Sequence, residues 1–390
     1  MSNSNILSKN FLLLCLSSFL FFASFNMLIP ELPDYISAMG GASYKGLIIG
    51  LFTITAGISR PFSGRLTDRW GRVPVMLAGS LVCVACGLLY PLANTVFLFL
   101  ALRFFHGFST GFKPTGTAAY VADIVPYQRR GEAMGLYGFV TSMGMAFGPF
   151  IGSWFAQYMS MNFLFLLSSA FAFISAIILY NLKETLSADR REGFSLSLFV
   201  LNKRDLFYIN AWPVAVVTFF TTFSYGIVIT LSPDLSKIIG LNNKGTYFLI
   251  FTLTSLLARI FGGRISDKIG RIKVLIFGCS LLILAMFITS LVSEWSYVMG
   301  AILFGVSWGV TSPTLQAWAV DKATDETRGR AIATMYISLE AGIGLGAVLP
   351  MVLYNNKPEL IHLAFWSGSA MAMFASFFLI WFLMRRSKIN

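Results

Sequence analysis

The chain has 390 residues, of which 56% are hydrophobic and only 12% are charged, and its formal net charge is +12. A soluble domain carries about 25% charged residues, so this inventory excludes a water-exposed globular surface and indicates lipid as the main solvent. The positive charge forms no basic face with interleaved aromatic residues, and we therefore expect no nucleic-acid partner.

Charge-poor stretches predict twelve spanning helices, because a bilayer crossing needs about 20 mostly apolar residues. Their centres lie near residues 20, 54, 83, 109, 145, 172, 219, 253, 283, 308, 342 and 372. The first stretch, residues 10–30, is too long for the apolar part of a signal peptide and no A-x-A site follows it, so we expect a retained helix.

A polar segment after the sixth predicted span divides the spans six and six. It predicts an N-terminal six-helix bundle over residues 1–182, a cytoplasmic linker over 183–207 and a C-terminal six-helix bundle over 208–390. The sequence thus predicts an all-α membrane protein, with twelve transmembrane helices in two pseudo-symmetric bundles.

Lys and Arg residues gather in alternate loops. Of the 29 in the chain, 21 fall in the loops on one side and 4 in the loops on the other, with the rest at or inside the membrane. Because basic loops stay in the cytoplasm, we expect both termini there. We predict a multi-pass protein of the plasma membrane, which in a bacterial cell is the inner membrane.

One short segment occurs twice, 199 residues apart. The first copy, Arg60–Arg72, reads RPFSGRLTDRWGR, and the second, Arg259–Arg271, reads RIFGGRISDKIGR. Further glycines and an aspartate recur at an offset of 198, for example Gly107 and Gly305, and Asp123 and Asp321. Six spans separate equivalent points, so both halves have the same orientation. Duplicated polytopic proteins of this kind are mostly transporters.

These residues resemble the major facilitator superfamily across the whole chain. Gly64–Arg72 is similar to the signature between that superfamily's second and third helices, and Gly263–Arg271 to its copy between the eighth and ninth. Arg103 with Gly107 and Gly111 resembles the fourth-helix motif that is linked to proton coupling. The resemblance implies the two-bundle fold and alternating access.

The fifth predicted span resembles that of the drug/proton antiporter branch, with Ser153 in place of the usual final glycine. Its pattern consists of Gly135, Gly144, Gly148, Pro149 and Gly152. Small residues let another helix approach closely, and a proline can kink a helix. We expect a bendable interface between the halves here, and ordinary small-residue packing is the alternative.

The repeated loops predict a cytoplasmic gate. Asp68 can accept hydrogen bonds from the free N–H groups at the start of the eleventh helix, and Asp267 can mirror this contact against the start of the fifth. The alternative is a stop-transfer cluster, which basic residues alone would fit. The gate candidates are Gly64, Asp68, Arg69, Gly71, Arg72, Arg129, Arg130, Gly263, Asp267, Gly270 and Arg271.

Charged residues within the spans are costly in lipid and indicate function. Lys113 and Glu340 both lie roughly 15 Å from the cytoplasmic end of their helices, in opposite halves. We predict that Glu340 is a protonatable carboxylate, and that Lys113 is its counter-charge or binds an anionic substrate group. The alternatives are a glutamate satisfied by nearby hydroxyls and a lysine that reaches the surface.

Arg103 and Glu31 form a second candidate group for proton coupling, as a pair near the outer face, with His106 as a relay. The alternatives are a solvated Glu31 and a packing role for His106. Further candidates for the substrate cavity are Asn26, Trp308 and Gln316, although Trp308 is equally explained by packing.

The leading function is proton-coupled efflux of small amphipathic or drug-like molecules, and import of a small nutrient such as a sugar or an organic acid is the alternative. No phosphate-binding loop for ATP is present. Cys83 and Cys86 are best read as two small hydrophobic residues. We therefore expect no enzyme, no metal and no cofactor. The expected partners are a small-molecule substrate, protons and the lipid bilayer. We expect the protein to be a monomer.

Overall fold

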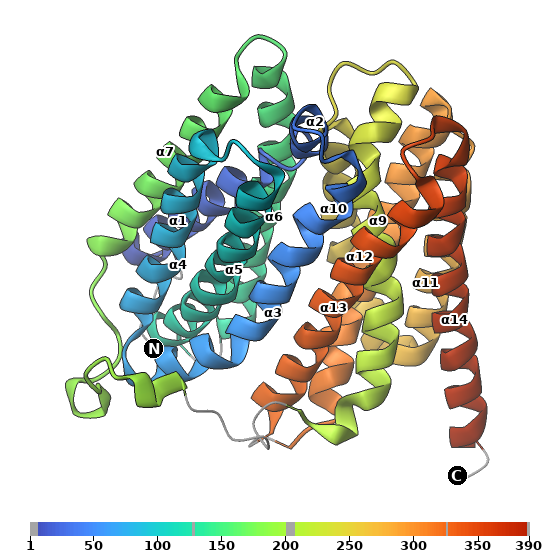
Figure 1. Cartoon of the computed structure of the whole chain (residues 1–390). Coiled ribbons are helices and arrows are strands. Elements are labelled where there is room, and N and C mark those ends of the chain that lie inside the picture. Colours follow the sequence, from blue (N-terminus) through green and yellow to red (C-terminus); the bar gives the residue numbers. More distant parts are fainter. Residues whose placement is uncertain (1–6, 127–128, 200–206, 325–326, 388–390) are drawn as a thin grey trace. The chain divides into compact units, whose positions relative to one another are not determined.

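The computed structural model describes residues 7–126, 129–199, 207–324 and 327–387, which form helices and short connecting turns (Figure 1). A short helix, α2, covers Leu32–Ala38. The long helices are α1 (Lys9–Asn26), α3 (Lys45–Arg69), α4 (Arg72–Leu89), α5 (Val96–Ile124), α6 (Arg130–Ala156), α7 (Met161–Tyr180), α9 (Trp212–Ile238), α10 (Thr246–Ile269), α11 (Arg271–Thr289), α12 (Glu294–Asp321), α13 (Arg328–Tyr354) and α14 (Ile361–Ser387).

Contacts divide the chain into two compact units. Unit 1 comprises Met1–Leu28 and Ile54–Asn202, and unit 2 comprises Ile29–Thr53 and Lys203–Asn390. The division falls inside α3, whose residues 45–53 group with unit 2. The predicted domain boundaries follow the polar linker, whereas this grouping follows the contacts.

Equivalent helices pack on one another in both units. In unit 1, α1 packs on α6 and α7, and α4 packs on α5 and α7. In unit 2, α9 packs on α13 and α14, and α11 packs on α12 and α14. The sequence repeat therefore has a counterpart in the internal packing of each unit.

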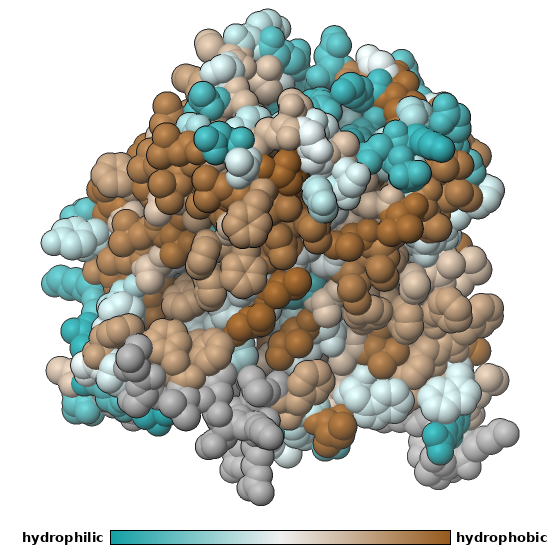
Figure 2. All heavy atoms as spheres, viewed as in Figure 1, coloured by the Kyte–Doolittle hydropathy of each residue, from teal (hydrophilic) through white to brown (hydrophobic). Residues whose placement is uncertain are grey.

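Ten helices in the described part of the chain are long and apolar enough to cross a membrane. Two further long helices fall outside that set. In α5 the charges of Arg103, Lys113 and Asp123 lower the hydropathy. In α10 the side chains of residues 261–264 lie outside the described part of the chain, and the apolar stretch before them is Thr246–Ile260. On the face drawn in Figure 2, apolar side chains cover the middle of the helices and hydrophilic ones gather near the ends. The count of twelve spans stays a prediction.

Glycines bring α6 into close contact with α1. A Cβ atom on Gly144 would lie 2.6 Å from the carbonyl oxygen of Phe19, and one on Gly148 would lie 2.8 Å from that of Ala23. Gly152 faces Met27 in the same way, whereas Gly135 has open space around it. These three glycines thus pack against α1 and the residue that follows it within unit 1, which agrees with the alternative of ordinary small-residue packing. A bendable interface between the halves stays a prediction.

We predict that Gly148→Ala destabilises the protein by about 1–3 kcal/mol, since the new methyl group overpacks the contact with α1. The matched control is Gly135→Ala in the same helix, where no neighbour lies within 4 Å and the higher helix propensity of alanine stabilises by up to about 1 kcal/mol. Thermal unfolding of the purified variants in detergent measures both, and equal melting temperatures would contradict the packing described.

Candidate functional site

Helix α5 carries Arg103 and His106 into the interior of unit 1, where they are 1% and 0% exposed. Nη1 of Arg103 donates a hydrogen bond to the hydroxyl of Tyr90 at 3.3 Å, and that hydroxyl lies 2.9 Å from Nδ1 of His106. Nε2 of His106 is 3.2 Å from Sγ of Cys83. The polar groups thus satisfy one another, as burial requires. Tyr90 is the member of this chain that sequence reasoning missed, since it stands alone in an apolar run.

The cysteines take part in packing and hydrogen bonding. Cys15, Cys83, Cys86 and Cys279 are all buried and free. Besides His106, the Sγ of Cys83 contacts the hydroxyl of Ser24 at 3.3 Å. Across the residues that the structure describes, no group of three or more His, Cys, Asp or Glu side chains is placed to hold a metal ion.

Lys113 is buried between α5, α1 and α7, and it is only 1% exposed. Its Nζ donates to the carbonyl oxygen of Ser17 at 2.9 Å and to the Ser17 hydroxyl at 3.0 Å, and it also bonds the hydroxyl of Ser175. The ring centre of Phe21 lies 4.5 Å away. These partners are neutral and internal, so the side chain does not extend to the membrane surface.

Asn26, a predicted cavity residue, is bound within its own helix. Its Nδ2 donates to the carbonyl oxygen of Phe22 at 2.7 Å, and the residue is 4% exposed. The amide therefore satisfies the backbone of α1 one turn earlier.

Glu340 lies near an aromatic cluster of unit 2 that includes Trp308. Glu340, on α13, is 8% exposed and interacts electrostatically with Tyr225 of α9. The ring of Tyr225 stacks on that of Trp308 of α12, with centroids 4.9 Å apart and planes inclined by 20°. Sequence reasoning missed Tyr225, because an aromatic residue in an apolar helix carries no distinguishing signal.

A small pocket of unit 2 opens beside this cluster. Trp308 and Gln316, both predicted cavity residues, line it with hydroxyl and apolar side chains from α9, α12 and α13. Its volume of about 20 Å³ is room for roughly one water molecule, whereas ligand pockets usually measure about 300–1,000 Å³. The pocket is thus too small to hold a substrate, and its residues form at most one part of a substrate site.

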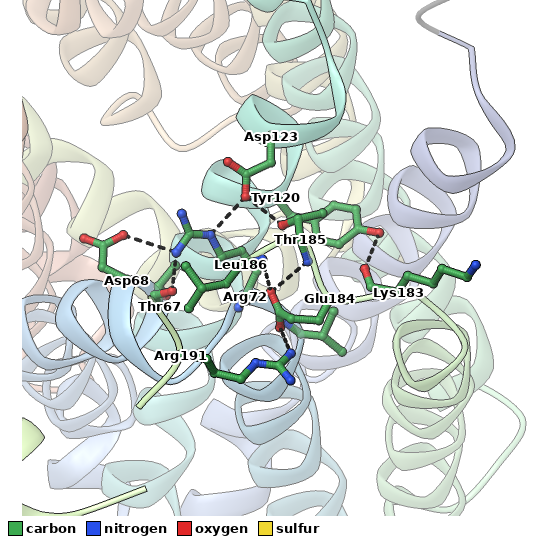
Figure 3. Close-up of polar contacts among 11 residues, drawn as sticks. Thr67, Asp68, Arg72, Tyr120, Asp123, Lys183, Glu184, Thr185, Leu186 and Arg191 are labelled. Atoms are coloured by element: carbon green, nitrogen blue, oxygen red, sulfur yellow. Dashed lines mark hydrogen bonds and ion pairs between the residues drawn. The ribbon is translucent and has the colours of Figure 1, made fainter. Parts of the chain in front are cut away.

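Arg72 connects three parts of unit 1 at the start of α4 (Figure 3). Its Nε donates to Asp123 at 3.0 Å, and its Nη1 donates to the carbonyl oxygen of Thr67 at 2.5 Å and lies 3.5 Å from Asp68. Gly71 precedes it with φ of +141°, a conformation that favours glycine. The guanidinium of Arg72 thus contacts Thr67, Asp68 and Asp123 at once, and we call this arrangement a fork. It holds the ends of α3 and α5 at the start of α4.

Glu184, from the predicted linker, closes the start of α4. Its carboxylate accepts hydrogen bonds from the N–H groups of Arg72 at 3.0 Å and Val73 at 2.9 Å, and Arg191 lies 3.6 Å from it. These are two of the N–H groups that a helix start leaves without a partner in the helix. Residues 200–206 of that linker lie outside the described residues.

The second copy of the motif builds the same fork in unit 2. Nε of Arg271 donates to Asp321 at 3.0 Å, while Nη1 donates to the Ser266 hydroxyl at 2.7 Å and bonds Asp267. Gly270 has φ of +95°. Gly71 and Gly270, and likewise Arg72 and Arg271, thus have equivalent local roles in the two units. The contact of either aspartate with the opposite half stays a prediction.

The other gate candidates lie near these forks or at helix starts. Arg69 forms an ion pair with Glu192 at 3.2 Å, and Arg129 forms one with Glu132 at 3.0 Å. The rest are helical residues: Gly64 in α3, Arg130 at the start of α6 and Gly263 in α10.

Unit 2 contains two segments of the chain, residues 29–53 and the residues after 203. Ion pairs connect residues 29–53 to α9 and to the loop that follows it. Nζ of Lys244 lies 2.6 Å from Glu31 and 2.8 Å from Asp34. A second pair, Lys45 with Asp234, is almost fully buried at 2.7 Å. The sequence suggests Arg103 as the partner of Glu31 and gives no sign of Lys244, because 213 residues separate Lys244 from Glu31. We call these five residues the outer cluster.

In the outer cluster, Asp34 and Lys244 keep their charges although both are partly buried. Burial opposes the ionised form of Asp34, but the hydrogen bonds and charges of Lys244 and then Lys237 lower its pKa below the usual 3.8. For Lys244, burial acts in the opposite sense, yet Glu31 and Asp34 raise its pKa above the usual 10.5. Both groups are therefore charged across the neutral pH range.

We predict that Asp34→Asn lowers the melting temperature by the same amount at about pH 5 and about pH 9. A carboxylate with a lowered pKa stabilises the fold above its unfolded value of 3.8, and this contribution disappears as the pH falls through the folded value. The lysine contribution is present below 10.5 and is lost as the pH rises through its raised folded value.

Thermal unfolding at several pH values checks this prediction, with the exposed Glu132→Gln as the control. A difference between wild type and Asp34→Asn that already disappears between pH 7 and pH 5 would contradict it.

Comparisons of sequence show what this chain resembles. Residues 14–325 and 214–389 match the profile of the Major Facilitator Superfamily. Multidrug resistance protein 2 of Bacillus subtilis (strain 168) is 29% identical over 278 residues, which are 68% of each chain. The multi-drug resistance efflux pump PmrA of Streptococcus pneumoniae serotype 4 is 29% identical over 270 residues, 66% of this chain and 67% of that protein.

Solved structures share the fold at low identity. The D-xylose-proton symporter aligns with a TM-score of 0.75 and 17% identity, over 95% of this chain and 96% of its own. The human organic anion transporter MFSD10 (TETRAN) aligns with a TM-score of 0.72 and 18% identity, over 95% and 98%. These findings confirm the resemblance and a transporter in place of an enzyme. The chain is a member of the Major Facilitator Superfamily, and it resembles the drug-efflux branch of that family.

Proposed function

We propose that this transporter exports small amphipathic or drug-like molecules in exchange for protons, by alternating access. It does so as a monomer with twelve spans, in two pseudo-symmetric bundles over residues 1–182 and 208–390 that the linker 183–207 joins. Both termini lie in the cytoplasm, and the membrane is the plasma membrane of a bacterial cell.

One observation carries the proposal: Glu340, a carboxylate 8% exposed within α13, interacts with Tyr225, whose ring stacks on Trp308. Acidic side chains inside membrane helices are costly and typically serve ion or substrate pathways. Aromatic faces suit flat apolar molecules. The names of the relatives, multidrug resistance protein 2 and multi-drug resistance efflux pump, support the same function.

Each half supplies a different chemistry in this mechanism. Glu340 takes up and releases the coupling proton in unit 2. In unit 1, Arg103 and His106 share the hydroxyl of Tyr90, which lets the hydrogen bonds rearrange when the charge nearby changes. Lys113 on α5 is the counter-charge of Glu340 or binds an anionic group of the substrate, and Trp308 and Gln316 contact the substrate.

The two ends of the helices serve as gates. The forks of Arg72 and Arg271 hold the cytoplasmic loops in shape, so that Asp68 and Asp267 can engage helix starts in the opposite half. The outer cluster ties residues 29–53 to α9 and the loop after it. Breaking it is the step that opens the outer side.

We predict that Glu340→Gln abolishes uphill export, because the amide cannot carry a proton, while the protein remains folded in the membrane. Everted vesicles with an imposed pH gradient and a fluorescent amphipathic cation measure this export. The matched control is Glu359→Gln, an exposed acid beyond the end of α13, which should behave as wild type. Undiminished export by Glu340→Gln would remove this residue from proton coupling.

We also predict that overexpression raises resistance to several unrelated amphipathic compounds in a host that lacks its own efflux pumps. A panel of drug susceptibilities measures this, with the Glu340→Gln variant as the inactive control. If resistance stays unchanged while labelled sugars or organic acids accumulate in the cells, the protein is instead an importer of a small nutrient.

A further inference from the structure

Five buried side chains of unit 1 form one continuous series of hydrogen bonds. Nη1 of Arg103 donates to the hydroxyl of Tyr90, and that hydroxyl meets Nδ1 of His106. Nε2 of His106 meets Sγ of Cys83, which in turn lies 3.3 Å from the hydroxyl of Ser24. All five residues are at most 1% exposed, so each of these hydrogens needs an acceptor inside the protein.

The direction of the series is fixed at its two ends. Arg103 can only donate, because a guanidinium has no acceptor, so the oxygen of Tyr90 accepts at that end. At the other end, the single hydrogen of the Ser24 hydroxyl goes to the carbonyl oxygen of Phe21 at 2.7 Å. The contact between Ser24 and Cys83 therefore uses the hydrogen of the thiol.

These two ends leave one arrangement of hydrogens for His106. The hydroxyl hydrogen of Tyr90 has Nδ1 as its acceptor, 2.9 Å away, and the described part of the chain shows no other acceptor for it. Nδ1 therefore carries no hydrogen. Because the thiol hydrogen of Cys83 is directed to Ser24, Nε2 of His106 carries the ring hydrogen and donates it to Sγ at 3.2 Å. The hydrogen bonds thus select a neutral imidazole in one of its two tautomers.

An imidazolium does not fit the same contacts, because it donates from both nitrogens. His106 and Arg103 would then both donate to the oxygen of Tyr90, and the hydroxyl hydrogen would lose its acceptor. Two buried positive charges would share one neutral oxygen, which is costly. The remaining groups that face the ring are Cys83 of α4 and the aromatic ring of Phe25 of α1, whose centroid lies 6.3 Å away.

The second copy of the repeat has apolar residues at the equivalent positions. Helices α5 and α12 align at the offset of 198, so Arg103 and His106 correspond to Ala301 and Phe304. The ring of Phe304 lies nearly parallel to that of Trp308, with planes inclined by 9°. A phenylalanine can therefore fill this position of the shared scaffold, and the polar pair of unit 1 has a use other than packing.

We propose that His106 is a positioning residue and not a carrier of the coupling proton. Its neutral ring accepts the hydroxyl hydrogen of Tyr90, which turns the oxygen lone pairs toward Arg103 and holds the guanidinium in place on α5. Tyr90 is the second positioning residue, since its hydroxyl makes both contacts. The role of Arg103 rests on the proposed function, whereas the tautomer of His106 rests on the hydrogen bonds alone.

Nuclear magnetic resonance of the full chain, reconstituted in lipid, observes the ring directly. The chain has two histidines, His106 and the half-buried His362, so histidine labelled with nitrogen-15 in the ring gives two sets of signals. The variant His106→Asn identifies one set by its loss. At about pH 5.5, below the usual histidine pKa of about 6.5, we expect His106 to be neutral with its hydrogen on Nε2. An imidazolium, or a hydrogen on Nδ1, overturns the proposal.

Two substitutions of His106 separate positioning from packing and from proton relay. Asparagine places an oxygen near the position of Nδ1 and can still accept from Tyr90, whereas phenylalanine keeps the ring but accepts nothing. We expect export in everted vesicles to fall about two- to threefold in His106→Asn, and roughly tenfold or more in His106→Phe and Tyr90→Phe, the size typical of hydrogen bonds to charged groups. Rates are normalised to the amount of folded protein, which thermal unfolding in detergent verifies.

Each outcome decides the proposal. Export that survives in His106→Phe but not in His106→Asn indicates packing, and equal export by the two variants indicates a relay when it is low and a dispensable ring when it is high; each of these overturns the proposal. So does undiminished export by Tyr90→Phe. If wild type exports nothing, the proposed function fails, and the labelled ring still decides whether His106 is held as the neutral tautomer.

Discussion

Charged side chains inside membrane helices must find their partners within the protein, because lipid supplies none. Here the partners are mostly neutral or distant in sequence. The hydroxyl of Tyr90 receives Arg103, two serines receive Lys113, and Asp234 receives Lys45. Each of these contacts fixes which face a helix turns toward the interior. The placement of α5, which buries both Arg103 and Lys113, follows directly from this requirement.

The two units share one scaffold and differ in the chemistry that they enclose. Unit 1 buries cations among hydroxyl groups, whereas unit 2 buries the carboxylate of Glu340 near stacked aromatic rings. The forks around Arg72 and Arg271 stayed nearly identical, because helix starts in both units need the same support. Divergence is concentrated where a substrate or ligand could bind, and conservation of geometry is concentrated at the helix ends.

Local features were predictable from the sequence, and long-range pairings were not. The repeat predicts equivalent turns in the two halves, and Gly71 and Gly270 both have positive φ, since motif and turn are contiguous. The pairs of Arg72 with Asp123 and of Arg271 with Asp321 were not among the predictions. The partner of Glu31 and the helix that faces the glycines of α6 depend on how helices rotate and pack, which no short pattern encodes. In the sequence Glu184 is one of several charges of the polar linker, because its role appears only when the linker folds back onto α4.

The burial of all four native cysteines has a practical consequence. The four side chains are buried between the helices, where the hydrophilic maleimide dyes used for labelling do not reach; they belong to Cys15, Cys83, Cys86 and Cys279. A cysteine introduced on each unit could therefore carry a donor and an acceptor fluorophore without removal of the natural thiols. Single-molecule energy transfer could then follow the separation of the units through a transport cycle, in an otherwise unaltered chain.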